Sequence, residues 1–303
     1  MSADRKIIVG TVISLVLTAL FAARGNAYVL QGQHVIQLMT EKLGQEKSLS
    51  VSQRVIFYNP VNLPDAQAAV ADQTASSPML QATMQLSESL KYIFSEAFRS
   101  DIVSESNQRV YVSNQGQSLT IIDGVISDAG ESRFDVYKDL LLYRSREILS
   151  ERLLNLGIDI SVSSLGRIDG RIAFVIGAEF PDKTVSQIWI DKETFHPLGI
   201  IVFGAKSPLD AHRGFLEIRY SNWQQIGEIN YPMQIEFIQD GVSVRTIEVD
   251  DYQINPSFSK DVFDIARLKL EYRQSTPKPD PARQSEGLSE VQKTIQEFQK
   301  LFE

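Results

Sequence analysis

The sequence predicts an α+β fold that is mainly β: one large curved antiparallel sheet with helices covering its concave apolar face. Three observations support this prediction. Apolar and polar residues alternate with period two in many short segments, glycine-bearing turns separate several of them, and only three segments show helical spacing. With 303 residues, 43% hydrophobic and 22% charged, the composition excludes a collagen, a disordered tail and a multi-span membrane protein.

Charge and cysteine usage exclude further classes. The chain carries 30 Lys and Arg against 38 Asp and Glu, a net charge of −8, so it lacks the cationic surface that nucleic acid requires. It contains no cysteine. Disulfides, thiolate catalysis, Cys-ligated zinc and a lipid-bearing N-terminal cysteine are therefore excluded.

The N-terminus has the pattern of a secretory signal. Arg5 and Lys6 precede the uncharged apolar run 7–21, and small residues stand at Gly25 and Ala27. This predicts a signal peptide over 1–27, cleaved after Ala27. An uncleaved membrane span is the alternative, but the run is shorter than the roughly 20 residues that a bilayer core needs. We expect a soluble protein of the Gram-negative periplasm.

The first part of the remaining chain predicts a helix, a strand and an insertion. Apolar residues over 35–43 recur at helical spacing and Gly44 follows as a C-cap, which predicts an opening helix. Residues 51–58 alternate as a half-buried strand. The proline-bearing stretch 59–80 is predicted to be a flexible insertion, in which a short helix near 66–71 could form.

The middle of the chain predicts strands followed by one helix. Residues 79–126 are strand-like, with glycine-bearing turns at 114–116 and 123–124. Residues 137–156 carry six Leu and Ile at helical spacing and end at Gly157, which predicts a single long helix.

Strands dominate after this helix, and one irregularity is expected among them. At Arg245-Thr246 the alternation changes parity, which predicts a β-bulge. Asp169-Gly170 and 191–194 are predicted turns. The later strands are predicted at 172–176, 187–190, 198–203, 216–220 and 233–237.

The C-terminal segment 275–303 combines a spacer with a helix. Pro277, Pro279 and Pro281 predict a stiff spacer, and apolar residues over 288–301 form a stripe on an amphipathic helix. A helix of about 15 residues is marginal alone. It is therefore expected to dock on its own sheet or to meet a partner or membrane surface.

The sequence contains no convincing catalytic pattern. His34, His196 and His212 have no zinc-ligand spacing, and the nucleophile-elbow, phosphate-loop and dinucleotide motifs are absent from the sequence. Ser257-Phe258-Ser259-Lys260 matches S-x-x-K, a match that chance explains, and the acidic residues at 248–251 lack the spacing of a calcium loop. We expect no catalytic residue, no metal and no cofactor, and predict that the protein is not an enzyme.

The predicted sheet itself indicates a function. A large apolar face must be covered, since burial stabilises by about 25 cal/mol per Å², and only three modest helices are available. Incomplete cover would leave an apolar cavity that acyl chains can fill. A core packed solid by the protein's own side chains is the alternative, and residue types alone do not separate the two.

Four segments resemble a known family. Phe98-Arg99 with 110–119 looks like the "FR … vyvsdGktl" segment of the LolA-like outer-membrane lipoprotein-sorting family. Residues 187–198 resemble its strand, acidic turn and strand, and 231–235 and 254–263 resemble its closing strands. The resemblance spans most of the chain through the order and spacing of these segments.

The resemblance implies an unclosed β-barrel, LolA/LppX-like, over residues 28–274, with helices as a lid over an apolar cavity. Its members receive lipoproteins from an inner-membrane ABC-type exporter and pass them to an outer-membrane acceptor. The implied partners are thus an acylated lipoprotein or lipid, such an exporter and such an acceptor, with the protein a monomer. Arg99 matches the arginine of the "FR" strand and would contact the lid or polar groups of the ligand, or else be an exposed strand cation.

The implied function is a carrier that buries acyl chains and moves them between the two membranes, acting in transport and as a chaperone. The alternative is an envelope sensor or regulatory module on the same fold, whose lipid binding would control a protein partner through the C-terminal helix. The predicted cavity wall comprises Val55, Phe57, Met84, Leu86, Trp189, Leu198, Ile200, Leu216, Ile218, Ile235 and Phe237.

Overall fold

The computed structural model describes residues 29–59, 81–104, 107–127, 131–203, 215–239 and 241–275. The chain divides into residues 1–30 and 31–303, and the helices and strands described below belong to the second unit. The predicted signal peptide, the 59–80 insertion after its first residue, and the C-terminal spacer and helix beyond Ser275 lie outside the described residues.

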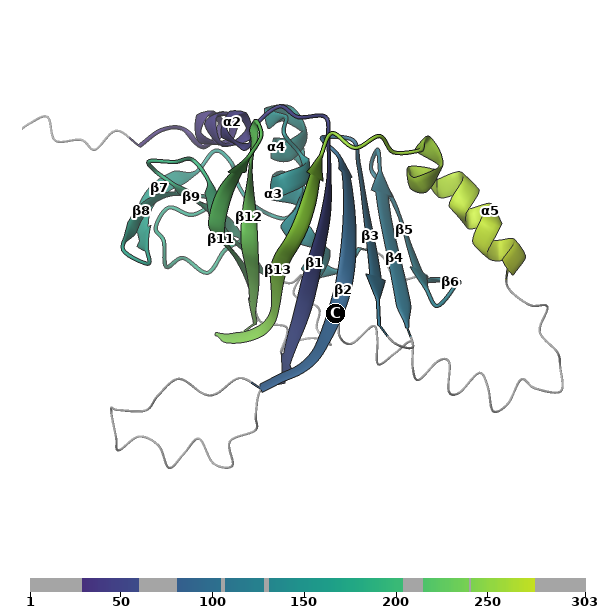
Figure 1. Cartoon of the computed structure of the whole chain (residues 1–303). Coiled ribbons are helices and arrows are strands. Elements are labelled where there is room, and N and C mark those ends of the chain that lie inside the picture. Colours follow the sequence, from purple (N-terminus) through teal and green to yellow (C-terminus); the bar gives the residue numbers. More distant parts are fainter. Residues whose placement is uncertain are drawn as a thin grey trace, which may run out of the picture. The chain divides into compact units, whose positions relative to one another are not determined.

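Within the described residues, thirteen strands form one antiparallel sheet in the order β6-β5-β4-β3-β2-β1-β13-β12-β11-β10-β9-β8-β7 (Figure 1). The two end strands β6 and β7 are not paired with each other, so the sheet is open. This confirms the predicted mainly β fold. The strands are β1 Ser48–Asn59, β2 Gln81–Ile93, β3 Ala97–Val103, β4 Gln108–Asn114, β5 Gln117–Ile122, β6 Val125–Ser127, β7 Ser163–Ile168, β8 Arg171–Ile176, β9 Gln187–Asp191, β10 Pro197–Phe203, β11 Phe215–Ile226, β12 Ile229–Gln239 and β13 Val242–Ile254.

The connection between β6 and β7 determines what covers the sheet. These strands are consecutive in the chain but lie at opposite edges, so the segment between them must cross a face. It contains the 3₁₀ helix η1 (Arg133–Lys138), α3 (Asp139–Leu142) and α4 (Arg146–Asn155). We call residues 131–156 the crossover segment. It lies over the concave face, where Phe134 and Tyr137 pack against Phe237. α2 (Gly32–Leu43) packs against α4 and β12.

The predicted single helix over 137–156 is wrong, because the chain breaks between α3 and α4 at Tyr143–Ser145. The break is held by contacts outside the helix. The Arg144 side chain donates from Nη1 to the Leu43 carbonyl at 2.6 Å and lies 3.5 Å above the Phe94 ring, while its backbone N–H donates to Ser95 Oγ. These tertiary contacts outweigh the helical spacing of the leucines on either side.

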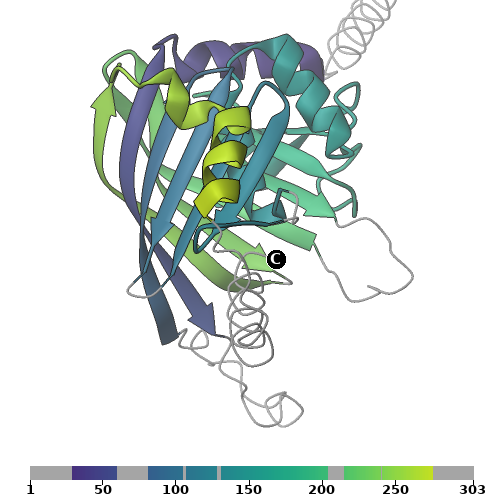
Figure 2. The same ribbon diagram turned by 90° about the vertical axis from the view of Figure 1, so that its right-hand side faces the viewer.

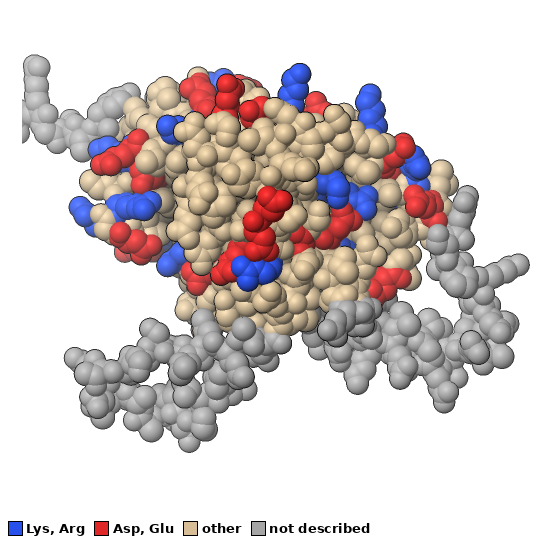
Figure 3. Space-filling model, in the orientation of Figure 1, with Lys and Arg blue, Asp and Glu red and all other residues tan. Residues whose placement is uncertain are grey.

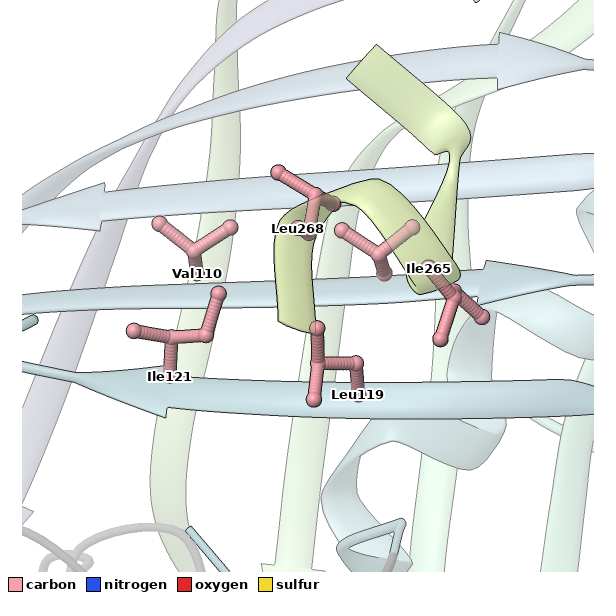
Figure 4. Close-up of a cluster of buried hydrophobic side chains, with 6 residues drawn as sticks. Val110, Leu119, Ile121, Ile265 and Leu268 are labelled. Atoms are coloured by element: carbon pink, nitrogen blue, oxygen red, sulfur yellow. The ribbon is translucent and has the colours of Figure 1, made fainter. Parts of the chain in front are cut away.

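The opposite, outer face carries a helix, α5 (Ile265–Ser275), that was not predicted from the sequence. It follows the 3₁₀ helix η2 (Lys260–Phe263), whereas 254–263 was expected as closing strand and only its first residue belongs to β13. Ile265 and Leu268 pack against β4 and β5 (Figures 2 and 4). The other buried members of this cluster are Val110, Val112, Leu119 and Ile121.

Two local predictions are confirmed. The opening helix is α2, and Gly44 caps it with φ 95°. The pairing of β12 with β13 changes register between Phe237↔Arg245 and Ile238↔Ser243, which leaves Val244 as the extra residue. The predicted β-bulge is therefore present, one residue before its expected place.

Gly44→Ala should destabilise the fold more than Gly124→Ala. Both glycines have positive φ, at 95° and 77°, which costs a residue with a Cβ about 1 kcal/mol. A Cβ at Gly44 would also overlap the Glu228 carbonyl oxygen and lie 2.8 Å from the Ile229 Cα, whereas nothing lies within 4 Å at Gly124. We expect a loss of about 2 kcal/mol or more for Gly44→Ala, measured by urea unfolding. Equal losses in the two variants would contradict this packing.

Candidate functional site

Two continuous rows of side chains cross the concave face. Residues opposite each other in neighbouring strands share a face, so the strand register identifies the members of each row. The first row runs from β2 to β8 through Met84, Phe57, Arg245, Phe237, Ile218, Ile200, Ile188 and Ile176. The second runs from β2 to β11 through Leu86, Val55, Ile247, Ile235 and Tyr220. We call them the two concave rows.

Eight of the eleven predicted wall residues lie in these rows, and a ninth, Leu216, follows Ile218 on the same side of β11. The structure places the other two elsewhere. Trp189 and Leu198 pack on the outer face in a separate cluster with Ala173 and Val175. The irregular register between Pro197 and Gly199 accompanies this change of side at Leu198. Whether any of these residues binds a ligand stays a prediction.

The crossover segment lies directly on the concave rows. The rings of Phe134 and Tyr137, both in η1, are centred 5.9 and 5.8 Å from the ring of Phe237. The Tyr220 hydroxyl donates to the Tyr137 carbonyl at 2.8 Å. This part of the predicted wall is therefore covered by the protein's own aromatic side chains, so access for a ligand requires the crossover segment to move.

A buried polar group, Arg245 with Glu88 beside it, interrupts the first row and was not predicted from the sequence. The Glu88 carboxylate accepts from Gln53 Nε2 at 2.6 Å and from Ser100 Oγ at 2.5 Å, and lies 3.8 Å from Arg245 Nη2. The Arg245 guanidinium lies 4.6 Å from the Phe237 ring centre, a cation–π contact. The sequence does contain a signal for this buried polar group. Gln53 and Glu88 occupy positions that the period-two alternation of their strands assigns to apolar, inward-facing residues.

A cluster of charges holds the crossover segment in place. Asp135 pairs with Arg109 of β4 at 2.6 Å, and both side chains are at most 5% exposed. Lys138 pairs with Asp139 at 2.9 Å and with Glu131, and Arg152 pairs with both of these carboxylates. We call these six residues the charge cluster. It joins η1, α3 and α4 to one another and to the sheet.

The charge cluster changes the pKa values of its members. Burial raises the pKa of Glu131, but Lys138 and Arg152 outweigh burial and lower it to about 2. For Lys138, burial lowers the pKa, but Asp139, Tyr111 and Glu131 raise it well above the ordinary value. For Asp139, burial dominates over its cationic partners and raises the pKa. Glu131 and Lys138 are therefore both charged at neutral pH.

Arg99 lies away from this cover. It opposes Val112 on β4, which belongs to the outer-face cluster under α5. Its guanidinium donates to Asp101 at 2.7 Å and to the Val262 carbonyl of η2 at 3.0 Å. Arg99 thus attaches η2 to the outer face, and the structure does not bring it together with the concave rows.

Other expected features can be placed as well. In the S-x-x-K match, Ser257 and Lys260 are both exposed. In the described part of the chain, no helix is both long and apolar enough to cross a membrane. Acidic and basic side chains are interspersed on the face shown in Figure 3.

The fold of this chain is similar to that of several solved structures. A LolA superfamily protein from Nitrosomonas europaea matches with a TM-score of 0.51 and 11% identity, over 78% of this chain and 98% of that chain. A putative outer membrane lipoprotein-sorting protein domain from Vibrio parahaemolyticus gives 0.49 and 12%, over 78% and 98%. A DUF1329 family protein from Desulfovibrio piger gives 0.47 and 13%, over 79% and 100%. No protein-family model and no curated protein matches the chain.

The chain therefore has the LolA-like fold, as its sequence resemblance indicated. Its open antiparallel sheet with helices over the concave face is that of the unclosed barrel expected for this class.

Glu131→Gln should reduce stability at neutral pH and have less effect in acid. Because the folded-state pKa of Glu131 is lowered from 4.5 to about 2, its contribution is present above pH 4.5 and is lost as the pH falls through about 2. We expect a difference of about 3 kcal/mol in unfolding free energy at pH 7, narrowing progressively below pH 4.5. Urea unfolding of both proteins at several pH values measures it.

Glu131 also contributes to the raised pKa of Asp139, so the comparison measures the Glu131 charge together with its effect on Asp139. Glu151→Gln, at an exposed position of α4, is the matched control and should follow the wild-type profile. A difference for Glu131→Gln that is the same at pH 3 and pH 7 would contradict the assigned pKa shift.

Proposed function

We propose that this protein is a periplasmic carrier that binds the acyl chains of lipoproteins or lipids between its sheet and its crossover segment. The observation that carries the proposal is the pair of concave rows, an apolar surface that runs across neighbouring strands of an open sheet. The LolA-like fold supports it, because the proteins that the sequence resembles carry acylated cargo on such a surface.

In the proposed mechanism the crossover segment is a lid. When it moves away, Phe134 and Tyr137 leave Phe237, and an acyl chain takes their place along the rows. Each Å² of apolar wall kept from water by the chain contributes about 25 cal/mol. Release reverses these steps without covalent change, and Phe134 and Tyr137 return to the wall.

The charge cluster suits a lid that must open reversibly. An apolar contact loses its full burial energy when it separates. Buried ion pairs regain hydration on separation, which offsets much of the lost attraction. A lid held by Arg109–Asp135 and by the pairs around Lys138 is therefore specific in position but less costly to open than an apolar lid of the same area.

The resemblance extends the proposal to partners. An inner-membrane ABC-type exporter would load the carrier, and an outer-membrane acceptor would unload it. A regulatory module is the second candidate, in which the loaded state would change affinity for a protein partner. The two candidates differ in what happens to the ligand: a carrier takes it from one membrane and delivers it to the other, whereas a regulatory module only responds to it.

Cross-linking α2 to α4 should block uptake of an acyl ligand. Gln37 Oε1 and Arg146 Nη1 lie 3.4 Å apart, and the chain has no cysteine of its own. In Gln37→Cys/Arg146→Cys, a reducible bifunctional thiol reagent would fix the lid. We expect uptake of a fluorescent fatty acid such as parinaric acid to fall at least about tenfold and to recover on reduction.

The two single-cysteine variants treated with the same reagent are the controls and should bind as the untreated protein does. Uptake that is unchanged after complete cross-linking would contradict a lid formed by the crossover segment. If the untreated wild-type protein takes up no fatty acid and carries no acylated molecule when purified from the periplasm, the carrier proposal itself is wrong.

A further inference from the structure

The outer face contains a cavity of about 650 Å³ beside the β7–β8 turn, on strands β11 and β12. Its floor is formed by cross-strand neighbours, with Arg219 opposite Glu236 and Ser221 opposite Gln234. Ile235, between Gln234 and Glu236, belongs to the concave rows, so the cavity and the proposed acyl site use opposite faces of the same strands. Tyr220 also lines the cavity, while its hydroxyl bonds to Tyr137 on the concave side. Its volume is within the range of small-molecule sites, roughly 300–1,000 Å³.

An aromatic pair forms one wall of this cavity. The rings of His196 and Trp223 are stacked, with centres 4.6 Å apart and planes inclined by 17°. Burial, with a contribution from Lys42, lowers the pKa of His196 below its ordinary value of 6.5. The imidazole is therefore neutral at pH 7, and this wall carries no charge.

The charged side chains of the cavity lining balance. Two cations, Arg171 and Arg219, stand with two carboxylates, Asp169 and Glu236. Each cation also has a carboxylate beside it, since Arg219 donates to Glu217 at 2.6 Å and Arg171 lies 3.9 Å from Asp191. A strongly anionic or cationic ligand would meet like charge here, so the lining favours a ligand without net charge.

The uncharged polar groups point to the same class of ligand. Asn222 and Ser221 both donate to Gln234 Oε1, at 3.0 and 3.4 Å, which orients the amide within the cavity lining. A ligand here meets donors from amide and guanidinium groups and acceptors from carboxylate and hydroxyl groups. Sugar hydroxyls both donate and accept, and the apolar face of a sugar ring can pack against an aromatic wall.

We propose that this cavity binds a neutral oligosaccharide. Gln234 and Glu236 would bond its hydroxyl groups, and the His196–Trp223 pair would contact a ring face. The site is independent of the proposed acyl-binding function, because it lies on the other face of the sheet and needs no movement of the crossover segment.

The test uses the intact protein with chitotriose and maltotriose as neutral probes. The chain has two tryptophans, so Trp189→Phe leaves Trp223 as the only tryptophan fluorophore. We expect a saturable change in Trp223 fluorescence with at least one probe. Gln234→Ala and Glu236→Gln should each weaken that binding about tenfold, which is the effect of one lost hydrogen bond to a polar ligand. Calorimetric titration of the wild-type protein gives the same information if Trp189→Phe does not fold.

Gln224→Ala is the matched control, because Gln224 is an exposed glutamine on the neighbouring strand β11 and lies outside the cavity lining. It should bind as the wild type does. Three results would overturn the proposal: no saturable binding of either sugar at about 10 mM, equal affinity in Gln234→Ala and Gln224→Ala, or saturation by inorganic phosphate in place of the sugars. A failure of acyl uptake would leave these outcomes unchanged.

Discussion

The structure depends on one constraint, the position of β6 and β7 at opposite edges of a single sheet. The pairing of β1 with β13 joins two meanders into a continuous surface, and the connection between β6 and β7 has to cross that surface. The concave face is therefore covered by a segment that is continuous with both edges. The buried pair between Asp135 and Arg109 fixes where the segment lies in the closed state, because a placement that kept either charge buried without its partner and away from water would cost several kcal/mol.

The same constraint explains the broken helix. In a straight helix over 137–156, consecutive residues would point to different sides of the helix. The crossover segment instead buries three consecutive leucines, Leu140–Leu142, completely. Arg144 turns the chain at this point by binding the carbonyls that end α2. Contacts between elements thus decide the local structure where intrinsic propensity favours a longer helix.

Most strands could be predicted because alternation with period two is a local property of the chain, and the glycine-bearing turns at 115–116 and 123–124 mark their ends. The members of the concave rows were largely predicted for the same reason. Leu198 was placed on the wrong side of the sheet, since a register irregularity near Pro197 is not visible in alternation alone. Trp189 was misplaced because it stands between Ile188 and Ile190, so three consecutive apolar residues do not show which face each one takes. Arg245 was missed as a wall residue because its environment depends on strands distant in the sequence.

The polar side chains in the concave face bear on which ligand the proposed carrier would bind. Arg245 occupies the centre of the first row, between Phe57 and Phe237, and Glu88 lies next to it. Glu88 and Arg245 have polar partners within the protein, but a hydrocarbon laid over charged groups gains less than one laid over the apolar part of the row. An amphiphile that lays its acyl chain along the Ile218–Ile200 side and its polar group near Arg245 satisfies both parts of the surface. If the proposed carrier function holds, we therefore expect acylated molecules with a polar head, rather than free hydrocarbons, as its cargo.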